Sequence, residues 1–240
     1  MNQNNSDIVD HIIETSLRTA RTYRWVSEPL TAGGAKAFVL QHILRNRFYS
    51  AVMRPAWMSR CPDLAIVRKT IGQMREELVC DDKINKAHTD ILWEFGRNIG
   101  LSDERMNSAA PEPMVTISFN ALENLARTRH WLAGWLGSSI EEFLGIALEG
   151  HTFNADTWKR VLGLSEEQVF FMRYHEKADL DHAGRAVWEP IRRHVTSPEI
   201  RGEIEEGLTI TLEANRCFYE GVASLGERLD REISRAAASA

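Results

Sequence analysis

Apolar residues recur at helical spacing along almost the whole chain, and this periodicity is the feature that most limits the possible folds. Ile8 and Ile12, for example, are four residues apart and therefore share one face of a helix. The alternation of apolar and polar residues that marks a half-buried strand is nearly absent. The sequence therefore predicts an all-α fold, a helical bundle with a buried centre.

Proline, glycine and charged interruptions divide this pattern into separate helices. Pro29 follows the first helix, Gly100 ends another, and Pro111 with Pro113 marks the longest loop signal, while a new helix start is indicated at 101–104. No internal repeat or low-complexity linker interrupts the chain, so we expect a single domain spanning 1–240. The predicted helices cover 7–24, 33–58, 62–77, 85–99, 117–136, 139–149, 154–162, 165–184, 186–195 and 199–234.

The composition excludes several classes of protein. The chain has 240 residues and a net charge of −5, without a basic run that would attract nucleic acid or anionic lipid. It has no apolar run of about 18 residues and no signal-peptide pattern at its start. The three cysteines, Cys61, Cys80 and Cys217, are widely spaced and form no C-x-x-C motif. We therefore expect a cytoplasmic protein that binds neither nucleic acid nor a membrane.

The segment 175–182 carries the strongest chemical signal. His175, Asp179 and His182 stand at positions i, i+4 and i+7, which lie on one face of a helix with about 100° per residue. Two imidazoles flanking a carboxylate form a ligand set suited to iron, manganese or zinc. The alternative is a solvated helix face, because a motif of this length also occurs by chance.

Further candidate ligands occur earlier in the chain. Glu76 and Glu77 stand at the end of the predicted helix 62–77, and His88 stands near the start of the next one. Glu149 follows an apolar stretch that is expected to face the core. A carboxylate in an apolar core is costly unless it is paired, protonated or bound to a metal. The alternative for Glu149 is a helix-end glutamate that points to solvent ahead of Gly150.

Glu76 and His88 can share a site only if the chain folds back between them. Twelve residues on one straight helix would separate the two by about 18 Å. The intervening segment contains Asp-Asp and Asn, which support a turn. We therefore predict that one helix ends near 78 and the next begins near 85. Asp81 is a competing carboxylate, because its shorter spacing to His88 needs a smaller distortion.

These residues together resemble the ligand pattern of the heme-oxygenase-like diiron oxidases and oxygenases, and in particular their CADD-like members. The resemblance covers about residues 70–195. It implies a heme-oxygenase-like helical bundle that holds two Fe(II) ions and uses O2 as cosubstrate. Glu76 is preferred over Glu77, because it follows Met-Arg as the family glutamate follows Met-Asp. The implied metal ligands are Glu76, His88, Glu149, His175, Asp179 and His182.

The resemblance also implies a reaction class. Such enzymes desaturate, cleave C–C bonds or oxygenate nitrogen, often in natural-product biosynthesis, and the preferred substrate here is an amino acid. A homodimer and an external reductant are further expectations. Lys159 matches a lysine of CADD-like members and is a candidate for substrate binding, although an amphipathic helix can also carry it as a solvated side chain.

Other residues are candidates for the substrate pocket, and two other functions stay open. Most aromatic residues belong to cores and most arginines are solvated. A cofactorless TenA-like or PqqC-like enzyme would use the same scaffold without metal, although Cys80 and Cys217 lack an obvious neighbouring base. The third possibility is a non-enzymatic helical binding protein. The pocket candidates are Trp25, Phe38, His42, Trp93, Phe153 and Trp158, and the arginines that could clamp a carboxylate are Arg45, Arg47, Arg173 and Arg193.

Overall fold

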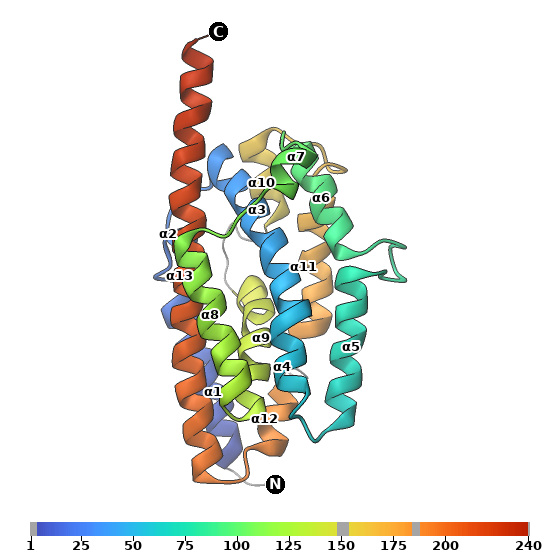
Figure 1. Ribbon diagram of the computed structural model, residues 1–240, viewed down its shortest axis with the longest axis vertical. Helices are drawn as coiled ribbons and strands as arrows, with labels where there is room; N and C mark the ends of the chain where they lie inside the picture. Colours follow the sequence, from blue (N-terminus) through green and yellow to red (C-terminus); the bar gives the residue numbers. More distant parts are fainter. Residues whose placement is uncertain (1–3, 148–153, 184–187, 240) are drawn as a thin grey trace.

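The computed structural model describes residues 4–147, 154–183 and 188–239, and the side chains at 4–6, 146–147 and 177–183 are outside this description. Within these ranges the chain is a bundle of helices (Figure 1). Pairing of the β type is limited there to an isolated bridge between Asp81 and Lys86. The prediction of an all-α fold is confirmed. Among the described helices, none combines the length and the apolar character that crossing a bilayer requires.

The helices follow one another with short connections. The first part of the chain forms α1 Asn4–Ala20, α2 Arg24–Ser27, α3 Ala32–Phe48, the π-helix η1 Tyr49–Met53, α4 Arg54–Met58, α5 Leu64–Leu78, α6 His88–Asn98 and α7 Asp103–Asn107. The second part forms α8 Pro113–Thr128, α9 Trp131–Ala147, α10 Ala155–Leu162, α11 Phe170–Ala183, α12 Glu189–His194 and α13 Pro198–Ala238.

Helix α13 is a long helix against which several other helices of the bundle pack. It runs along α3 and α8, and its C-terminal end projects beyond the other helices (Figure 1). The backbones of α3 and α13 touch, since a Cβ added at Gly33 would lie 2.5 Å from the amide nitrogen of Asp230. The Asp230 carboxylate accepts hydrogen bonds from the Gly33 amide at 2.7 Å and from the Thr31 hydroxyl at 2.6 Å. The start of α3 is thereby tied to α13.

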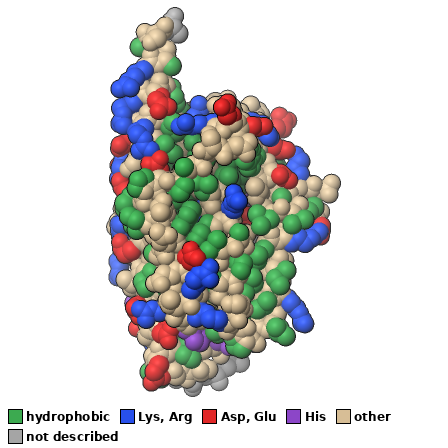
Figure 2. Space-filling view, in the orientation of Figure 1, with side chains coloured by type: hydrophobic (Ala, Val, Ile, Leu, Met, Phe, Trp, Pro, Cys, Tyr) green, Lys and Arg blue, Asp and Glu red, His purple; other side chains and the backbone are tan. Residues whose placement is uncertain are grey.

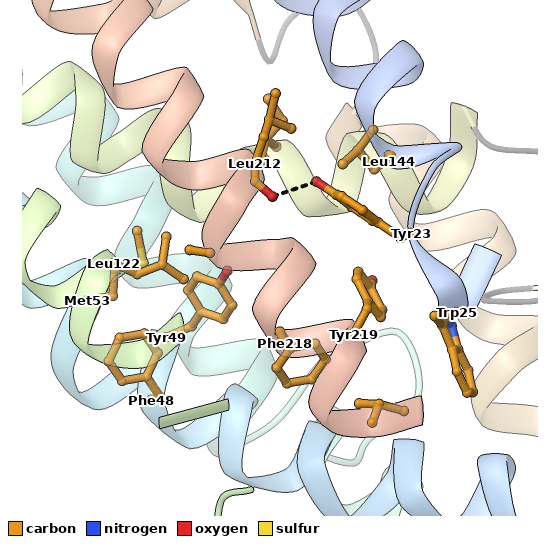
Figure 3. Packing of buried hydrophobic residues seen from close by; sticks show 14 of the residues in the cluster. Tyr23, Trp25, Phe48, Tyr49, Met53, Leu122, Leu144, Leu212, Phe218 and Tyr219 are labelled. Atoms are coloured by element: carbon orange, nitrogen blue, oxygen red, sulfur yellow. Dashed lines mark hydrogen bonds between the residues drawn. The ribbon is translucent and has the colours of Figure 1, made fainter. Parts of the chain in front are cut away.

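The core beside this helix is rich in aromatic rings. Trp25 stacks on Phe38 with ring centroids 5.4 Å apart, and the Tyr23 hydroxyl donates to the carbonyl of Leu212 at 2.7 Å. Figure 3 shows this bond, with Tyr219 on the same helix as Leu212. These buried rings pack the N-terminal segment of the chain against α3 and α13.

Two predicted boundaries on either side of 137 are wrong. The sequence predicts helices over 117–136 and 139–149, whereas α8 ends at Thr128 and α9 continues through Gly137. Arg129 takes an extended backbone conformation with ψ 171°, which ends α8. A Cβ at Gly137 would lie 2.7 Å from the Cε atom of Met53. This glycine therefore serves close packing inside a helix instead of a break.

The predicted fold-back near 78–85 is confirmed. Helix α5 ends at Leu78 and α6 begins at His88. Between them, the Asp81 amide donates to the carbonyl of Lys86 at 2.9 Å, and Asn85 adopts a left-handed conformation with φ 53°. Asparagine tolerates this region better than most residues. The turn brings the last residues of α5 next to the first residue of α6.

Helix α5 lies at the edge of the bundle with an apolar stripe on its outer side. Leu64, Ile71 and Leu78 are spaced seven residues apart and are all exposed. Figure 2 shows hydrophobic side chains on this side of the molecule. The opposite face of α5 carries Gln73 and Glu77 towards the interior, where Glu77 borders a cavity.

Candidate metal centre

The imidazole of His88 is held between two carboxylates. Its Nδ1 lies 3.2 Å from Oε1 of Glu77, and its Nε2 lies 3.0 Å from Oδ2 of Asp81. The His88 residue is only 3% exposed. Glu77 comes from the last turn of α5 and Asp81 from the connecting turn, so the fold-back creates this arrangement.

Each of these three groups stabilises the charged form of its neighbour. Burial alone would lower the pKa of His88, but the hydrogen bonds and charges of Glu77 and Asp81 outweigh it and raise the pKa to about 9. Burial alone would raise the pKa of Glu77, whereas the hydrogen bond and charge of His88 lower it to about 2. For Asp81, the hydrogen bonds from Tyr174 and His88 overcome burial in the same way and lower its pKa to about 2. An imidazolium between two carboxylates is thus the stable state at neutral pH.

Helix α11 brings a second imidazole to this cluster. The Nδ1 atom of His175 lies 2.8 Å from the carbonyl oxygen of Phe171, which can only accept, so Nδ1 carries a proton. Nε2 is then the nitrogen that can coordinate a metal. The ring centroids of His88 and His175 are 5.1 Å apart. The neighbouring Tyr174 hydroxyl donates to Asp81, which connects α11 to the α5–α6 turn.

A cavity of about 70 Å³ lies beside the two histidines. That volume exceeds what a single water molecule needs. Glu142 reaches the cavity from α9, where its Oε1 accepts from Arg54 at 3.0 Å and its Oε2 lies 3.5 Å from Nε2 of Gln73. Arg54 follows the π-helix η1, a local distortion that often occurs at functional sites. The cavity is lined by His42, Arg45, Asn46, Tyr49, Arg54, Glu77, His88, Ser138, Glu141, Glu142 and His175.

Two of the predicted ligands, His88 and His175, line this cavity. The hydrogen bonds of His88 go to Glu77 and Asp81, the two alternatives to Glu76. The geometry therefore favours Glu77 as the carboxylate from α5, because it also borders the cavity. Glu76 as a ligand remains a prediction from the resemblance.

The other predicted ligands are described in part or not at all. The backbone of Asp179 and His182 belongs to α11, one and two turns beyond His175, which agrees with the predicted shared helix face. Their side chains are outside the described part of the chain, and Glu149 lies outside it altogether. Lys159 is on α10, where its ammonium pairs with Glu166 at 3.1 Å, and it does not border the cavity.

Glu142 is a candidate that the sequence reasoning missed. It stands seven residues before Glu149, a spacing that the sequence periodicity assigns to the same side of a helix. Like Glu149, Glu142 is a carboxylate within an apolar stretch, between Ile140 and Leu144. The sequence predicts His42 only as a pocket residue, and it does border the cavity. Burial, followed by the charges of Arg45 and His175, lowers the pKa of His42 to about 3, so this imidazole is neutral.

The donor types in this cavity fit iron, since imidazole and carboxylate together form the usual non-heme ligand set. Among the side chains that the structure describes, no three His, Cys, Asp or Glu groups converge closely enough to hold a metal ion. Both ring nitrogens of His88 are engaged with carboxylates. Glu77, His88, Glu142 and His175 would hold the metal once His88 exchanges a hydrogen bond for a coordinate bond.

Comparison with known proteins agrees with this chemistry. A family model described as iron-containing redox enzyme matches residues 36–216, well over half of the chain. The chain belongs to this family. The iron-containing redox enzyme described here is therefore an oxidoreductase, and the predicted resemblance to heme-oxygenase-like proteins is confirmed at the level of the family.

A solved structure supports the fold of this iron-containing redox enzyme. The chain is similar to a domain of unknown function with a heme oxygenase-like fold from Shewanella denitrificans, with a TM-score of 0.65 and 14% sequence identity. The similarity covers 92% of this chain and 90% of that chain. No curated protein matches the sequence. At this identity the similarity establishes the heme-oxygenase-like fold alone.

Proposed function

We propose that this iron-containing redox enzyme is a non-heme diiron oxidase or oxygenase that uses O2 to oxidise a small substrate. The observation that carries the proposal is the cavity that His88 and His175 line together with the carboxylates of Glu77 and Glu142. Four helices, α5, α6, α9 and α11, each contribute one of these side chains. Asp179 and His182 would complete the set from α11, as the spacing of the triplet predicts.

The surrounding residues would hold the ligands in place. Two bound Fe(II) ions would supply the reduction of O2. Asp81 and Tyr174 orient the His88 ring, and the Phe171 carbonyl fixes the proton of His175 on Nδ1. Outer partners of this kind usually tune both ligand orientation and metal affinity. Arg54 and Gln73 orient Glu142 in the same way.

The finer features of the function are proposals that rest on the resemblance. We propose an amino acid as the substrate, an external reductant and a place in natural-product biosynthesis. We also propose a homodimer in the cytoplasm. The exposed apolar stripe of Leu64, Ile71 and Leu78 on α5 supports self-association, because exposed apolar stripes often mark interfaces. Light scattering on the purified protein would test the dimer.

A cofactorless oxidase on the same scaffold is the alternative. The observation that favours it is the double engagement of His88, since both ring nitrogens already have carboxylate partners. In a cofactorless enzyme this imidazolium would serve proton transfer. Such an enzyme would turn over substrate after exhaustive chelation, whereas the proposed diiron enzyme would not.

Anaerobic loading with Fe(II) tests the proposal. We expect wild-type protein to retain iron after desalting and to show a transient visible absorption after O2 is added. His88→Ala and His175→Ala should lose both signals. His11→Ala is the matched control, because His11 is exposed on α1 and far from the cavity in sequence. Equal iron retention in all four proteins would contradict the proposal.

A further inference from the structure

A buried ion pair forms part of the wall of the cavity. Arg45 of α3 is 1% exposed and pairs with Glu141 of α9. Nη2 of Arg45 also donates to Oδ1 of Asn215 at 3.0 Å, and the Tyr219 hydroxyl donates to Oε1 of Glu141 at 2.9 Å. Arg45 and Glu141 both border the cavity that contains His88 and His175. The pair is therefore part of the candidate site and not only of the core.

The polar atoms around this pair are incompletely satisfied. Nη1 of Arg45 is fully buried and has no hydrogen-bond partner among the described residues. The same holds, within the described part of the chain, for Nδ2 of Asn215 and Nδ1 of His42. Buried polar atoms without partners are uncommon and costly, and each calls for an explanation. A ligand in the cavity would supply the missing partner of the guanidinium.

Aromatic rings fix the position of the guanidinium. Cζ of Arg45 lies 4.0 Å from the ring centroid of Phe218 and 5.3 Å from that of Tyr49. Figure 3 shows Phe218 and Tyr219 on neighbouring positions of α13, with Tyr49 close by. Contact with these rings leaves the edge of the guanidinium, with its N–H groups, for polar partners. Such a fixed fork is suited to a carboxylate.

We propose that Arg45 and Glu141 bind the zwitterionic head group of an α-amino acid, with Arg45 at the carboxylate and Glu141 at the ammonium group. A zwitterion can contact both members of the pair without adding net charge to a buried site. A simple acid or a simple amine would leave one buried charge without compensation, which is strongly unfavourable. The inference rests on the proposed function, because it places the head group in the cavity of the candidate iron ligands.

A second cavity provides room for the rest of the substrate. It has a volume of about 190 Å³ and lies between α5, α9 and α12. Glu142 borders both cavities, and Ile66 with Trp135 forms apolar wall in the larger one. A head group at Arg45 and a side chain directed to the second cavity would lead the substrate past Glu142, His88 and His175.

Ligand-observed NMR with the proteinogenic L-amino acids as probes tests this inference on the full chain. The protein is loaded with Mn(II), which occupies iron sites without turnover, and each amino acid is offered separately at millimolar concentration. We expect at least one to bind, and its decarboxylated amine and its deaminated acid to bind about tenfold more weakly or worse. Binding of none, or equal binding of the amine or the acid, would overturn the inference.

Conservative variants separate recognition from a merely structural pair. Arg45→Lys keeps the charge and loses the fork, and Glu141→Gln keeps the shape and loses the charge. Each should weaken amino-acid binding about tenfold or more, with Mn(II) uptake and helical content unchanged. The matched control is Arg97→Lys, in the exposed Arg97–Asp103 pair. If Arg45→Lys does not fold, Tyr219→Phe replaces it. This variant removes the hydrogen bond to Glu141 and should also weaken amino-acid binding. Unchanged amino-acid affinity in the folded variants would contradict the inference.

The two proposals fail in different ways. Metal uptake without amino-acid binding would leave the proposed diiron function standing and overturn the head-group site. Amino-acid binding that depends on Arg45 and Glu141, in a protein that takes up no metal, would confirm the head-group site and contradict the diiron proposal.

Discussion

Nε2 of His88 lies 3.0 Å from Oδ2 of Asp81, seven residues earlier in the chain. The turn at 79–87 makes this contact possible, and the same turn places Glu77 against the other ring nitrogen. The imidazolium of His88 thus compensates one of the two carboxylate charges beside it. Exchange of that proton for a metal ion is the chemical event on which the proposed function depends.

The stability of the metal-free protein should depend on the protonation of His88. Its pKa rises from 6.5 to about 9 on folding, so the stabilisation is complete below pH 6.5 and is lost as the pH rises through 9. The pKa values of Glu77 and Asp81 fall to about 2, so their contribution is present above about pH 4.5 and is lost in acid. We expect the free energy of unfolding to fall by on the order of 3 kcal/mol between pH 6.5 and 9.

Urea unfolding in the presence of a chelator, at intervals of pH, measures this dependence. His88→Gln should remove most of the alkaline slope, since it has no proton to lose. An equal slope in that variant would show that other groups are responsible.

Three isosteric variants distinguish the candidate carboxylates near His88. Glu77→Gln should lower iron affinity about 100-fold or more, because Glu77 borders the cavity, and Asp81→Asn about 10-fold to 100-fold, as expected of a partner that orients a ligand. Glu76→Gln should have little effect. The measurement is competition with a fluorescent Fe(II) chelator under anaerobic conditions. A larger loss for Glu76→Gln than for Glu77→Gln would restore the choice made from the resemblance.

A second pair of variants tests the ligand from α9. Glu142→Gln should abolish retention of at least one iron, because Glu142 borders the same cavity as His88 and His175. Glu149→Gln, seven residues later, is the comparison with identical chemistry. Iron content after desalting gives the answer, and loss of iron in Glu149→Gln alone would favour the prediction from the sequence.

The contact between α3 and α13 predicts opposite effects of two glycine substitutions. Gly33→Ala places a methyl group against the backbone of Asp230 and Gly226, and we expect a loss of about 2–3 kcal/mol in the free energy of unfolding. Gly72→Ala in α5 meets no atom within 4 Å and should stabilise by about 0.5–1 kcal/mol, because alanine favours helix. Urea titration of both variants checks the contrast, and a neutral Gly33→Ala would argue against the close helix approach.

Local sequence accounted for the helical fold and for the fold-back before His88, because apolar spacing and turn residues act over a few positions. It did not distinguish Glu76 from Glu77. Adjacent helix residues point about 100° apart, and only the packing of α6 on α5 decides which of them faces inward. The choice between Glu142 and Glu149 has a similar origin, since a spacing of seven residues gives both the same position in the helical periodicity of the sequence.

The boundary between α8 and α9 shows a further limit. A glycine such as Gly137 often marks the end of a helix, but here it allows a close contact with Met53 of the π-helix. A glycine used for packing and a glycine used for a turn are identical in the sequence. Arg129, which ends α8, has no turn signature of its own. The proposed head-group site of Arg45 and Glu141 also depends on contacts between helices that are distant in the sequence. No local pattern reveals such contacts.

Anaerobic titration with ⁵⁷Fe(II), followed by Mössbauer spectroscopy, measures whether the chain binds iron through His88 and His175. We expect two high-spin Fe(II) ions per chain in nitrogen and oxygen ligand environments, and we expect His88→Ala and His175→Ala each to lose this signal. A chain that binds no ferrous ion, or that binds it equally well without these two imidazoles, would contradict the account.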